Sequence, residues 1–243
     1  MVSFLKGGFI MVKQVADPFL TDPLSALHEY FDGIINVREG TYLFQEGMEV
    51  HELYCIQSGL VQISKTTSDG RELALKICKK GDLIGEFSIF SNDPKHIFNA
   101  KVLENSSIYF IKKERLECKL FENPNLSLSF LKWMSEQYQI TQTKFRDLIL
   151  NGKKGALYST LIRMANTYGV ETENGILINI DMTNQELANF CGATRESINR
   201  MLSNLRKKGV ISFQNKKITI HDLQYLKDAI NCENCPVSYC RID

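Results

Sequence analysis

The densest group of reactive side chains in this sequence is a set of three cysteines near its end. Cys232, Cys235 and Cys240 fall within nine residues, in the spacing C-x2-C-x4-C. Thiolates this close together bind a metal such as zinc, hold an iron–sulfur cluster or form a disulfide. Because the spacing is compatible with all three chemistries, the elements that position these cysteines must provide the context.

The composition is that of an ordinary globular protein. The chain has 243 residues, of which 44% are hydrophobic and 23% charged, and its net charge is +1. This length predicts one large or two modest domains. The near-neutral charge argues against a uniformly polycationic nucleic-acid binder, but it is compatible with a local basic face.

We find no signal for export or membrane insertion in the sequence. No apolar run approaches the roughly 18–20 residues that a membrane span needs. The first residues lack the features of a signal peptide, and Met11 is a second possible start. Beyond the tail, four further cysteines lie in apolar or periodic stretches, which is typical of core thiols inside the cell: Cys55, Cys78, Cys118 and Cys191. We therefore expect a cytoplasmic protein with no membrane partner.

Short strands broken by glycine are expected over the first half of the chain. Apolar and alternating patterns predict strands at residues 52–56, 60–64, 72–78, 98–102 and 107–111. The segment Ser68-Asp69-Gly70 has hairpin chemistry, since Asp-Gly favours a type I′ turn. Many short strands at regular spacing indicate a β-sandwich or a barrel.

A long helix is expected next, over residues 125–150, because this stretch has no internal Gly or Pro. Its apolar residues recur in steps of three and four, which is the pattern of a coiled-coil seam. We expect two chains to pair along the seam as a homodimer; the alternative is a helix that packs on its own domain. Asp147 lies off the seam, and residues 151–155 are expected to separate two domains. The seam residues are Leu131, Met134, Tyr138, Thr141, Phe145 and Leu148.

The second half has the pattern of a winged helix-turn-helix. A helix is expected at 156–168, a strand at 175–180 and a two-stranded wing at 210–213 and 217–220. Thr183 and Glu186 form a capping box for a helix that ends at Gly192, and Thr194 can cap the helix at 195–207. Residues 152–231 hold eleven Lys or Arg and seven Asp or Glu, so this half is locally basic.

The exposed start of the helix at 195–207 has side chains that can read DNA bases. Arg195 and Arg200 can each fork onto a guanine, and Glu196 can accept from the amino group of a cytosine. Ser197 lies on the same first turn, which is the part of a recognition helix that reaches base edges. Phosphate contacts are expected from Arg206, Lys207, Lys208, Lys216 and Lys217.

Together these features resemble the Crp/Fnr family of transcription regulators. The resemblance is carried by Ser58-Gly59 and Lys80-Gly81-Asp82, and by the run from Gln185 to Arg200. It implies an α+β fold with a cyclic-nucleotide-binding-like β-roll, a long dimerisation helix and a C-terminal winged helix-turn-helix. The implied parts are an N-terminal arm and helix (1–34), the roll (35–115), the dimerisation helix (116–150), the DNA-binding domain (151–230) and the cysteine tail (231–243).

The resemblance also implies partners. Family members with the pattern Arg-Glu-x-x-x-Arg read TGTGA half-sites, so Arg195, Glu196 and Arg200 are expected to read them here. A homodimer then implies a palindromic target in double-stranded DNA, and a regulator of this kind implies RNA polymerase as a further partner. We see no constellation of catalytic residues and expect no enzyme activity.

The ligand site of the roll departs from the family pattern. Members that bind cyclic AMP have a Gly-Glu pair, followed about ten residues later by an Arg-Ser pair that holds the phosphate. Here Gly85-Glu86 is followed by His96 and Ile97. A cyclic phosphate needs a fixed cation and a hydroxyl donor, so we expect no cyclic-nucleotide binding.

The cysteine tail resembles the Gram-positive type of Fnr, whose cluster lies behind the DNA-binding domain. This implies a [4Fe-4S] cluster held by Cys232, Cys235 and Cys240, with Asp147 as the fourth ligand. The expected function is that of an oxygen- or redox-responsive regulator, an activator of anaerobic genes that binds DNA while its cluster is intact. The alternatives are an electron-transfer protein similar to ferredoxin, or a regulator that responds to a small-molecule effector and has a structural zinc site or a thiol switch in its tail.

Overall fold

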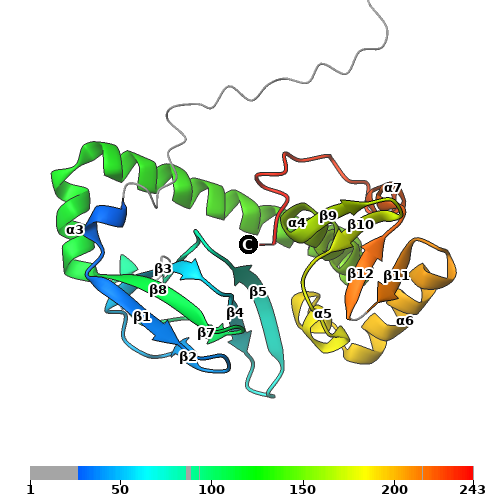
Figure 1. Ribbon diagram of the computed structural model, residues 1–243, viewed down its shortest axis with the longest axis horizontal. Coiled ribbons are helices and arrows are strands. Elements are labelled where there is room, and N and C mark those ends of the chain that lie inside the picture. The colour runs from blue at the N-terminus through cyan, green and yellow to red at the C-terminus, as the bar shows by residue number, and fades with distance from the viewer. Residues whose placement is uncertain (1–26, 86–88, 93, 215, 243) are drawn as a thin grey trace, which may run out of the picture.

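The computed structural model describes residues 27–85, 89–92, 94–214 and 216–242. Most of the expected N-terminal arm, Glu86 of the Gly-Glu pair and Asn215 of the wing lie outside these ranges. Figure 1 shows two lobes that are joined by one long helix. The first half of the chain forms a β-rich lobe and the second half a smaller lobe of helices and strands, so the α+β architecture expected from the sequence is confirmed.

The β-rich lobe, called the roll below, consists of two antiparallel four-stranded sheets. One has the order β1-β8-β3-β6 and the other the order β2-β7-β4-β5. Buried side chains from both sheets, including Ile56, Val61 and Val102, form one apolar cluster. A short 3-10 helix, η1 (His28–Tyr30), precedes the sheets. The strands are β1 Gly33–Val37, β2 Tyr42–Phe44, β3 Glu52–Ser58, β4 Val61–Thr66, β5 Glu72–Cys78, β6 Leu83–Ile84, β7 Asn99–Val102 and β8 Ser106–Lys112.

The hairpin expected around Gly70 is present, but the predicted turn type, I′, was wrong. β4 and β5 pair from Thr66 opposite Glu72, so the loop has five residues rather than two. A type I′ turn needs two successive residues with positive φ, and within this loop only Gly70 has one, at 80°. The hydroxyl of Thr67 donates to the carbonyl of Arg71 over 3.0 Å and closes the longer loop.

Two helices follow the roll, α3 (Lys113–Glu122) and α4 (Pro124–Tyr168). The break expected at 151–155 is a kink inside α4, where Gly152 has a non-helical conformation with φ 56° and ψ −157°. Positive φ strains residues other than glycine. Gly155 is needed for space, because a Cβ there would lie 1.9 Å from the Cβ of Asn151. Although α4 is long, no helix among the described residues is both long and apolar enough to span a membrane.

The two faces of α4 before the kink have different environments. Leu126, Phe130 and Trp133 are buried in a cluster with residues of the roll, and Met134 is partly buried against it. Most of the expected seam lies on the other face, where these side chains remain largely exposed to solvent. The exposed fractions are 63% for Leu131, 63% for Tyr138, 59% for Phe145 and 41% for Leu148.

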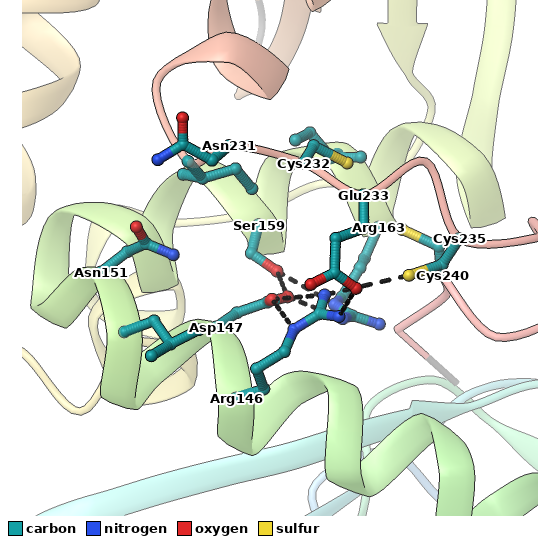
Figure 2. Close-up of a pocket in the computed structure, with 13 residues that line it drawn as sticks. Arg146, Asp147, Asn151, Ser159, Arg163, Asn231, Cys232, Glu233, Cys235 and Cys240 are labelled. Atoms are coloured by element: carbon teal, nitrogen blue, oxygen red, sulfur yellow. Dashed lines mark hydrogen bonds and ion pairs between the residues drawn. The ribbon is translucent and has the colours of Figure 1, made fainter.

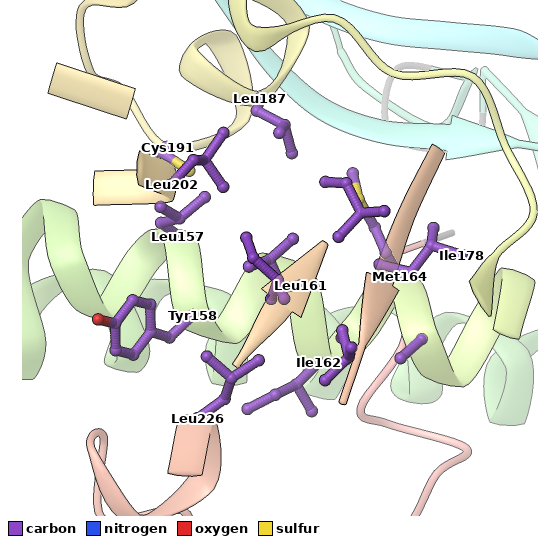
Figure 3. Close-up of a cluster of buried hydrophobic side chains, with 14 of the residues drawn as sticks. Leu157, Tyr158, Leu161, Ile162, Met164, Ile178, Leu187, Cys191, Leu202 and Leu226 are labelled. Atoms are coloured by element: carbon purple, nitrogen blue, oxygen red, sulfur yellow. The ribbon is translucent and has the colours of Figure 1, made fainter. Parts of the chain in front are cut away.

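The second lobe has a four-stranded antiparallel sheet in the order β11-β12-β10-β9. As the spacing predicted, Leu157, Leu161 and Met164 of α4 are buried, and they share one cluster with Leu187 and Leu202 (Figure 3). The elements of this lobe are β9 Gly169–Thr172, β10 Gly175–Ile178, α5 Asn184–Phe190, α6 Arg195–Lys207, β11 Ile211–Gln214, β12 Lys217–Ile220 and α7 Leu223–Asp228.

The expected helix ends in this lobe are confirmed. Thr183 and Glu186 form the reciprocal capping box of α5, and the Thr194 hydroxyl caps α6. Gly192 between the two helices has the expected positive φ, 55°. In this lobe β9 and α7 were not predicted, since β9 is exposed along its whole length and α7 has only six residues. In the first half of the chain β1, β2, β6 and α3 were not predicted either.

The two lobes touch through β5 and α5. Ile77 of β5 is only 2% exposed and belongs to the buried cluster of the second lobe. The side-chain amide of Asn189 donates to Glu72 over 2.9 Å, and the hydroxyl of Tyr168 donates to the carbonyl of Ile77 over 3.5 Å. Contacts with the roll therefore hold the second lobe in place together with α4.

Three of the four cysteines outside the tail are core thiols, as expected. Cys55, Cys78 and Cys191 are buried. The prediction is wrong for Cys118, which is exposed on α3 with its sulfur 3.3 Å from a carboxylate oxygen of Glu122. The reason is helical periodicity, because the buried residue of this short helix is Leu116.

His96 and Ile97 stand where members of the family that bind cyclic AMP have an Arg-Ser pair, and His96 is buried in the roll. His96 is 4% exposed, and its ring stacks on that of Phe44 with 3.6 Å between centroids. Burial, with a smaller contribution from His51, lowers the pKa of His96 from 6.5 to about 4. His96 is therefore neutral at pH 7, and the neighbouring Ile97 is half exposed. This pair differs in both charge and hydrogen bonding from a phosphate-binding Arg-Ser pair.

His96 is expected to make the roll sensitive to acid. Because its pKa is lower in the folded protein than the ordinary value of 6.5, protonation favours the unfolded chain and stability falls as the pH drops below 6.5. The loss is about 2 kcal/mol at pH 5, since each pKa unit corresponds to about 1.4 kcal/mol. Urea unfolding between pH 7 and pH 4 should show this loss in the wild type and a flatter profile in His96→Gln. The exposed His28, replaced by Gln, is the control, and equal profiles for all three proteins would contradict the prediction.

Candidate functional site

The tail that follows α7 folds back onto α4. Its residue Ile242 is buried, and the Ile242 amide donates to the hydroxyl of Thr167 over 3.1 Å. The side-chain amide of Asn166 donates to the carbonyl of Cys240 over 2.6 Å, and Lys144 donates to the carbonyl of Ile242 over 2.8 Å. Because these partners come from both sides of the kink, the tail bridges the two parts of α4.

A cavity of about 250 Å³ lies between the tail and the kinked helix (Figure 2). Asp147, Cys232, Cys235 and Cys240 all line it, so the structure brings together the four ligands proposed from the sequence. The three cysteines are partly buried free thiols, and Figure 2 shows Cys232 set apart from the other two. Within the described ranges, no three His, Cys, Asp or Glu side chains are close enough together to hold a metal ion. The thiols therefore share a cavity without converging on one point.

Asp147 is buried, at 7% exposure, and both of its carboxylate oxygens accept hydrogen bonds. Its Oδ2 accepts from the hydroxyl of Ser159 (2.5 Å) and from Nη2 of Arg163 (2.8 Å). Its Oδ1 accepts from Nη2 (3.0 Å) and Nε (3.2 Å) of Arg146. In a straight helix, residues 147 and 159 would be about 18 Å apart along the axis. The contact exists because α4 bends at Gly152.

The environment of Asp147 keeps its carboxylate ionised. Burial by itself would raise the pKa of Asp147. The hydrogen bonds from Ser159, Arg163 and Arg146 outweigh burial and hold this pKa below its usual value. The site therefore offers a buried carboxylate anion at neutral pH.

Two arginines that the sequence did not single out complete this site. Arg163 is 3% exposed, and its Nη1 donates to the carbonyl of Tyr239 over 3.1 Å. Arg146 donates to Glu233 over 2.5 Å, and its Nη2 lies 3.9 Å from the sulfur of Cys235. A signal for Arg163 was available, because it interrupts the apolar run 161–165 and a charge inside such a run needs partners. We find no comparable signal for Arg146.

The types of donor that line the cavity, rather than their present spacing, match a cationic group with thiolate ligands. Burial raises the pKa of Cys240, although the nearby Arg163 opposes this, so metal binding would have to displace its proton. Three thiolates and the Asp147 carboxylate form an anionic donor set. Both an iron–sulfur cluster and zinc accept such a set, and the buried Arg163 would offset part of the remaining negative charge.

The second candidate site is the outer face of α6. Arg195, Glu196 and Arg200 are exposed, as base reading requires. Ser197 is partly buried, and the Thr194 hydroxyl lies 3.1 Å from its hydroxyl and 3.3 Å from its amide. Ser197 is therefore engaged in the helix cap as well as being on the reading face. The opposite face of α6 buries Ile198, Leu202 and Leu205.

Basic residues flank this reading face. Arg206 and Lys207 are exposed at the end of α6, and Lys216 is exposed on the wing. The other two expected phosphate ligands have intramolecular partners, since Lys208 donates to the hydroxyl of Tyr225 and Lys217 to the side chain of Asn179, each over 2.7 Å. Figure 1 shows α6 and the wing strands β11 and β12 together, at the end of the second lobe far from the roll.

Two domain families match the chain. The cyclic nucleotide-binding domain family matches residues 34–123, which comprise the roll and α3. The Crp-like helix-turn-helix domain family matches residues 155–229, which comprise most of the second lobe. The cysteine tail lies outside both matches.

Curated relatives that match over most of their length agree with these domain matches. The anaerobic regulatory protein of Bacillus subtilis is 50% identical over 97% of this chain and 99% of its own length. The lactate racemization regulatory protein of Lactiplantibacillus plantarum is 30% identical over 85% of this chain and 95% of its own length.

The solved structures share the fold at lower identity. The c-di-GMP responsive global regulator CLP of Xanthomonas campestris superposes with a TM-score of 0.71 at 21% identity, over 82% of this chain and 98% of its own. A variant of CooA from Carboxydothermus hydrogenoformans gives a TM-score of 0.73 at 20% identity, over 86% and 96%. The two domain matches and the full-length relatives show that this chain belongs to the Crp/Fnr family of transcription regulators.

Proposed function

We propose that this protein is an oxygen- or redox-responsive transcription regulator whose sensor is a [4Fe-4S] cluster at the kink of α4. The observation that carries the proposal is that Asp147 of the long helix and the three tail cysteines line one cavity. The 50% identity with the anaerobic regulatory protein of Bacillus subtilis supports a role in the control of anaerobic genes.

The ligands of the cluster would be Cys232, Cys235, Cys240 and Asp147. When bound, the cluster supplies an oxygen-labile link between the tail and the long helix. Arg163 orients the carboxylate by holding Oδ2 of Asp147. The tail and the two parts of α4 meet at this point, so the gain or loss of the link shifts the population of orientations of the second lobe, as ligand binding does in general.

The output of this switch is DNA binding by a dimer. The exposed seam of α4 is the surface along which we propose that two chains pair. The two copies of α6 then enter successive major grooves, and the target is a palindrome with half-sites about one helical turn apart. Arg195, Glu196 and Arg200 read TGTGA half-sites, and RNA polymerase is the partner that an activator recruits. Such a regulator acts in the cytoplasm.

A second candidate function is favoured by a larger cavity. It measures about 590 Å³, and its walls are mostly apolar side chains of β5 and α4, including Leu73, Ile140 and Phe145. Cavities of this size bind small molecules, and in a regulator of that kind the tail would hold zinc or act as a thiol switch. Analysis of anaerobically purified protein for iron, sulfide and zinc separates the two candidates, because zinc without iron would favour the second.

Cluster assembly and DNA binding are expected to rise and fall together. Anaerobic reconstitution with iron and sulfide should produce a broad visible absorption, and exposure to air should remove it. DNA binding, measured in parallel by fluorescence anisotropy on a palindromic TGTGA site, should be lost over the same time course. A cluster that survives air, or DNA binding that does not change with it, would contradict the proposed sensor.

Replacement of Asp147 tests the fourth ligand. Asp147→Asn keeps the shape and an acceptor oxygen for Arg163 but removes the anionic ligand. We expect it to take up less iron and sulfide than the wild type and to lose its cluster faster in air. The exposed Asp181, replaced by Asn, is the matched control. A normal, equally stable cluster in Asp147→Asn would remove the aspartate from the ligand set and leave the three cysteines in place.

Arg200→Ala tests base reading by α6. Loss of a bidentate contact should cost about 1–3 kcal/mol of binding free energy at one base position and relax specificity there. Arg206→Ala is the contrasting variant, because a phosphate contact should weaken binding to all sequences about equally. Competition binding with single-base variants of the target measures both. A uniform loss in Arg200→Ala would show that this residue does not read a base.

A further inference from the structure

The guanidinium group of Arg146 lies between the carboxylate and a thiol that we propose as ligands. It donates twice to Oδ1 of Asp147, over 3.0 and 3.2 Å, and once to Glu233 of the tail, over 2.5 Å. Its Nη2 also lies 3.9 Å from the sulfur of Cys235. Figure 2 shows these contacts converging on one cation at the centre of the site. Arg146 thus makes the same connection, from Asp147 to Cys235, that a shared metal centre would make.

The two arginines of the site differ in how firmly they are held. Arg163 is 3% exposed and is tied to Asp147 and Tyr239 on different parts of the fold. The side chain of Arg146 is 31% exposed, and its salt-bridge partner Glu233 is 66% exposed. A long, partly exposed side chain can turn into water with its charge still solvated. Arg146 can therefore leave the cavity, whereas Arg163 is fixed.

The two carboxylate oxygens of Asp147 also differ in how firmly their hydrogen-bond partners are held. Oδ2 is held by the buried Ser159 and Arg163, which line the cavity themselves. The contacts to Oδ1 come from Arg146, on the side of the thiols. If Arg146 moved out, Oδ1 would face the cysteines while Oδ2 remained hydrogen-bonded, as is usual for a carboxylate that ligates a metal.

We propose that Arg146 is a built-in substitute for the cluster: it occupies the centre of the site in the cluster-free protein and turns out into solvent when the cluster binds. This inference rests on the proposed function. A buried carboxylate beside thiols needs a counter-charge, and Arg146 supplies one in the absence of iron. A metal ligated by Oδ1 would compete with Arg146 for the lone pairs of that oxygen. The cluster with four anionic ligands retains a net charge of about −2, which the buried guanidinium group of Arg163 offsets in part.

The consequence is an ordered cluster-free state. Arg146 keeps the segment with Glu233 and Cys235 folded over the kink, so the tail is already in position when a cluster is delivered. It also competes with the cluster for Asp147, and this competition sets how readily the site is loaded.

The first test measures order in the cluster-free protein. In Arg146→Gln purified in air, amide hydrogen exchange over residues 232–237 should be about tenfold faster than in the wild type, because charge-assisted hydrogen bonds to the tail are lost. Residues 239–242 are the internal control, since Arg163, Asn166 and Thr167 hold them. Arg38→Gln, which removes an exposed guanidinium from the roll, is the matched control. Unchanged exchange over 232–237 would overturn the proposal.

The second test measures cluster uptake. Under anaerobic reconstitution with limiting iron, Arg146→Gln should reach the same final iron and sulfide content as the wild type, but severalfold faster. A lower final content would overturn the proposal, because Arg146 would then be needed in the loaded site. Absence of a cluster in the wild type would overturn the proposed function and the substitution with it. Faster exchange over 232–237 in that case would still identify Arg146 as a clamp on the tail, which separates the two failures.

Discussion

Asp147 lies buried between two guanidinium groups, and an ionised carboxylate persists in such a place only through the charges and donors around it. Those donors come from two parts of one helix that a straight geometry would separate by about 18 Å or more. The kink at Gly152 brings them together. Arg163 then extends the network to the carbonyl of Tyr239 and so to the tail. The tail that carries the cysteines is therefore anchored in part by this buried ion pair, which the bend at Gly152 permits.

The same network places the candidate sensor where it can affect DNA binding. Arg163 lies on the helix whose apolar face is the centre of the second lobe, beside Leu161 and Met164. A change at the kink is thus a change at the base of the lobe that carries α6. The lobe is also held on its other side, where Ile77 of the roll is buried in its core. The orientation of the second lobe therefore depends on its attachment to α4 and on its contact with β5.

The roll supports both α4 and the second lobe. Its sheets bury one face of α4 through Phe130 and Trp133, and its strand β5 supports α5 through Glu72 and Asn189. The opposite face of α4 keeps its apolar side chains exposed. Within one chain, α4 is therefore packed on the roll through one face and exposes the apolar seam of the other, which leaves the seam accessible to a second copy.

Local features were predictable from the sequence alone. The capping box at Thr183 and Glu186, the cap at Thr194 and the turn at Gly192 rest on hydrogen bonds and φ angles within a few residues. The helix α6 and its exposed Arg195 and Arg200 follow from the same short-range rules. The alternating strands predicted a β-sandwich or a barrel, and the roll itself was implied by the family resemblance. Cys118 shows the limit of such reasoning, since a plausible apolar stretch did not reveal which side of a short helix faces solvent.

Tertiary structure alone decided the surroundings of Asp147. Its position near the end of the long helix was clear, but its burial and its partners Ser159, Arg163 and Arg146 were not. These contacts depend on the direction in which the chain leaves Gly152, and a glycine permits many directions. Hydrophobic periodicity predicts which residues share a face of a continuous helix, but it does not predict which residues come together across a bend. The sequence therefore determined the candidate ligands and the helix with the exposed arginines, and the bend determined that the candidate ligands line one cavity.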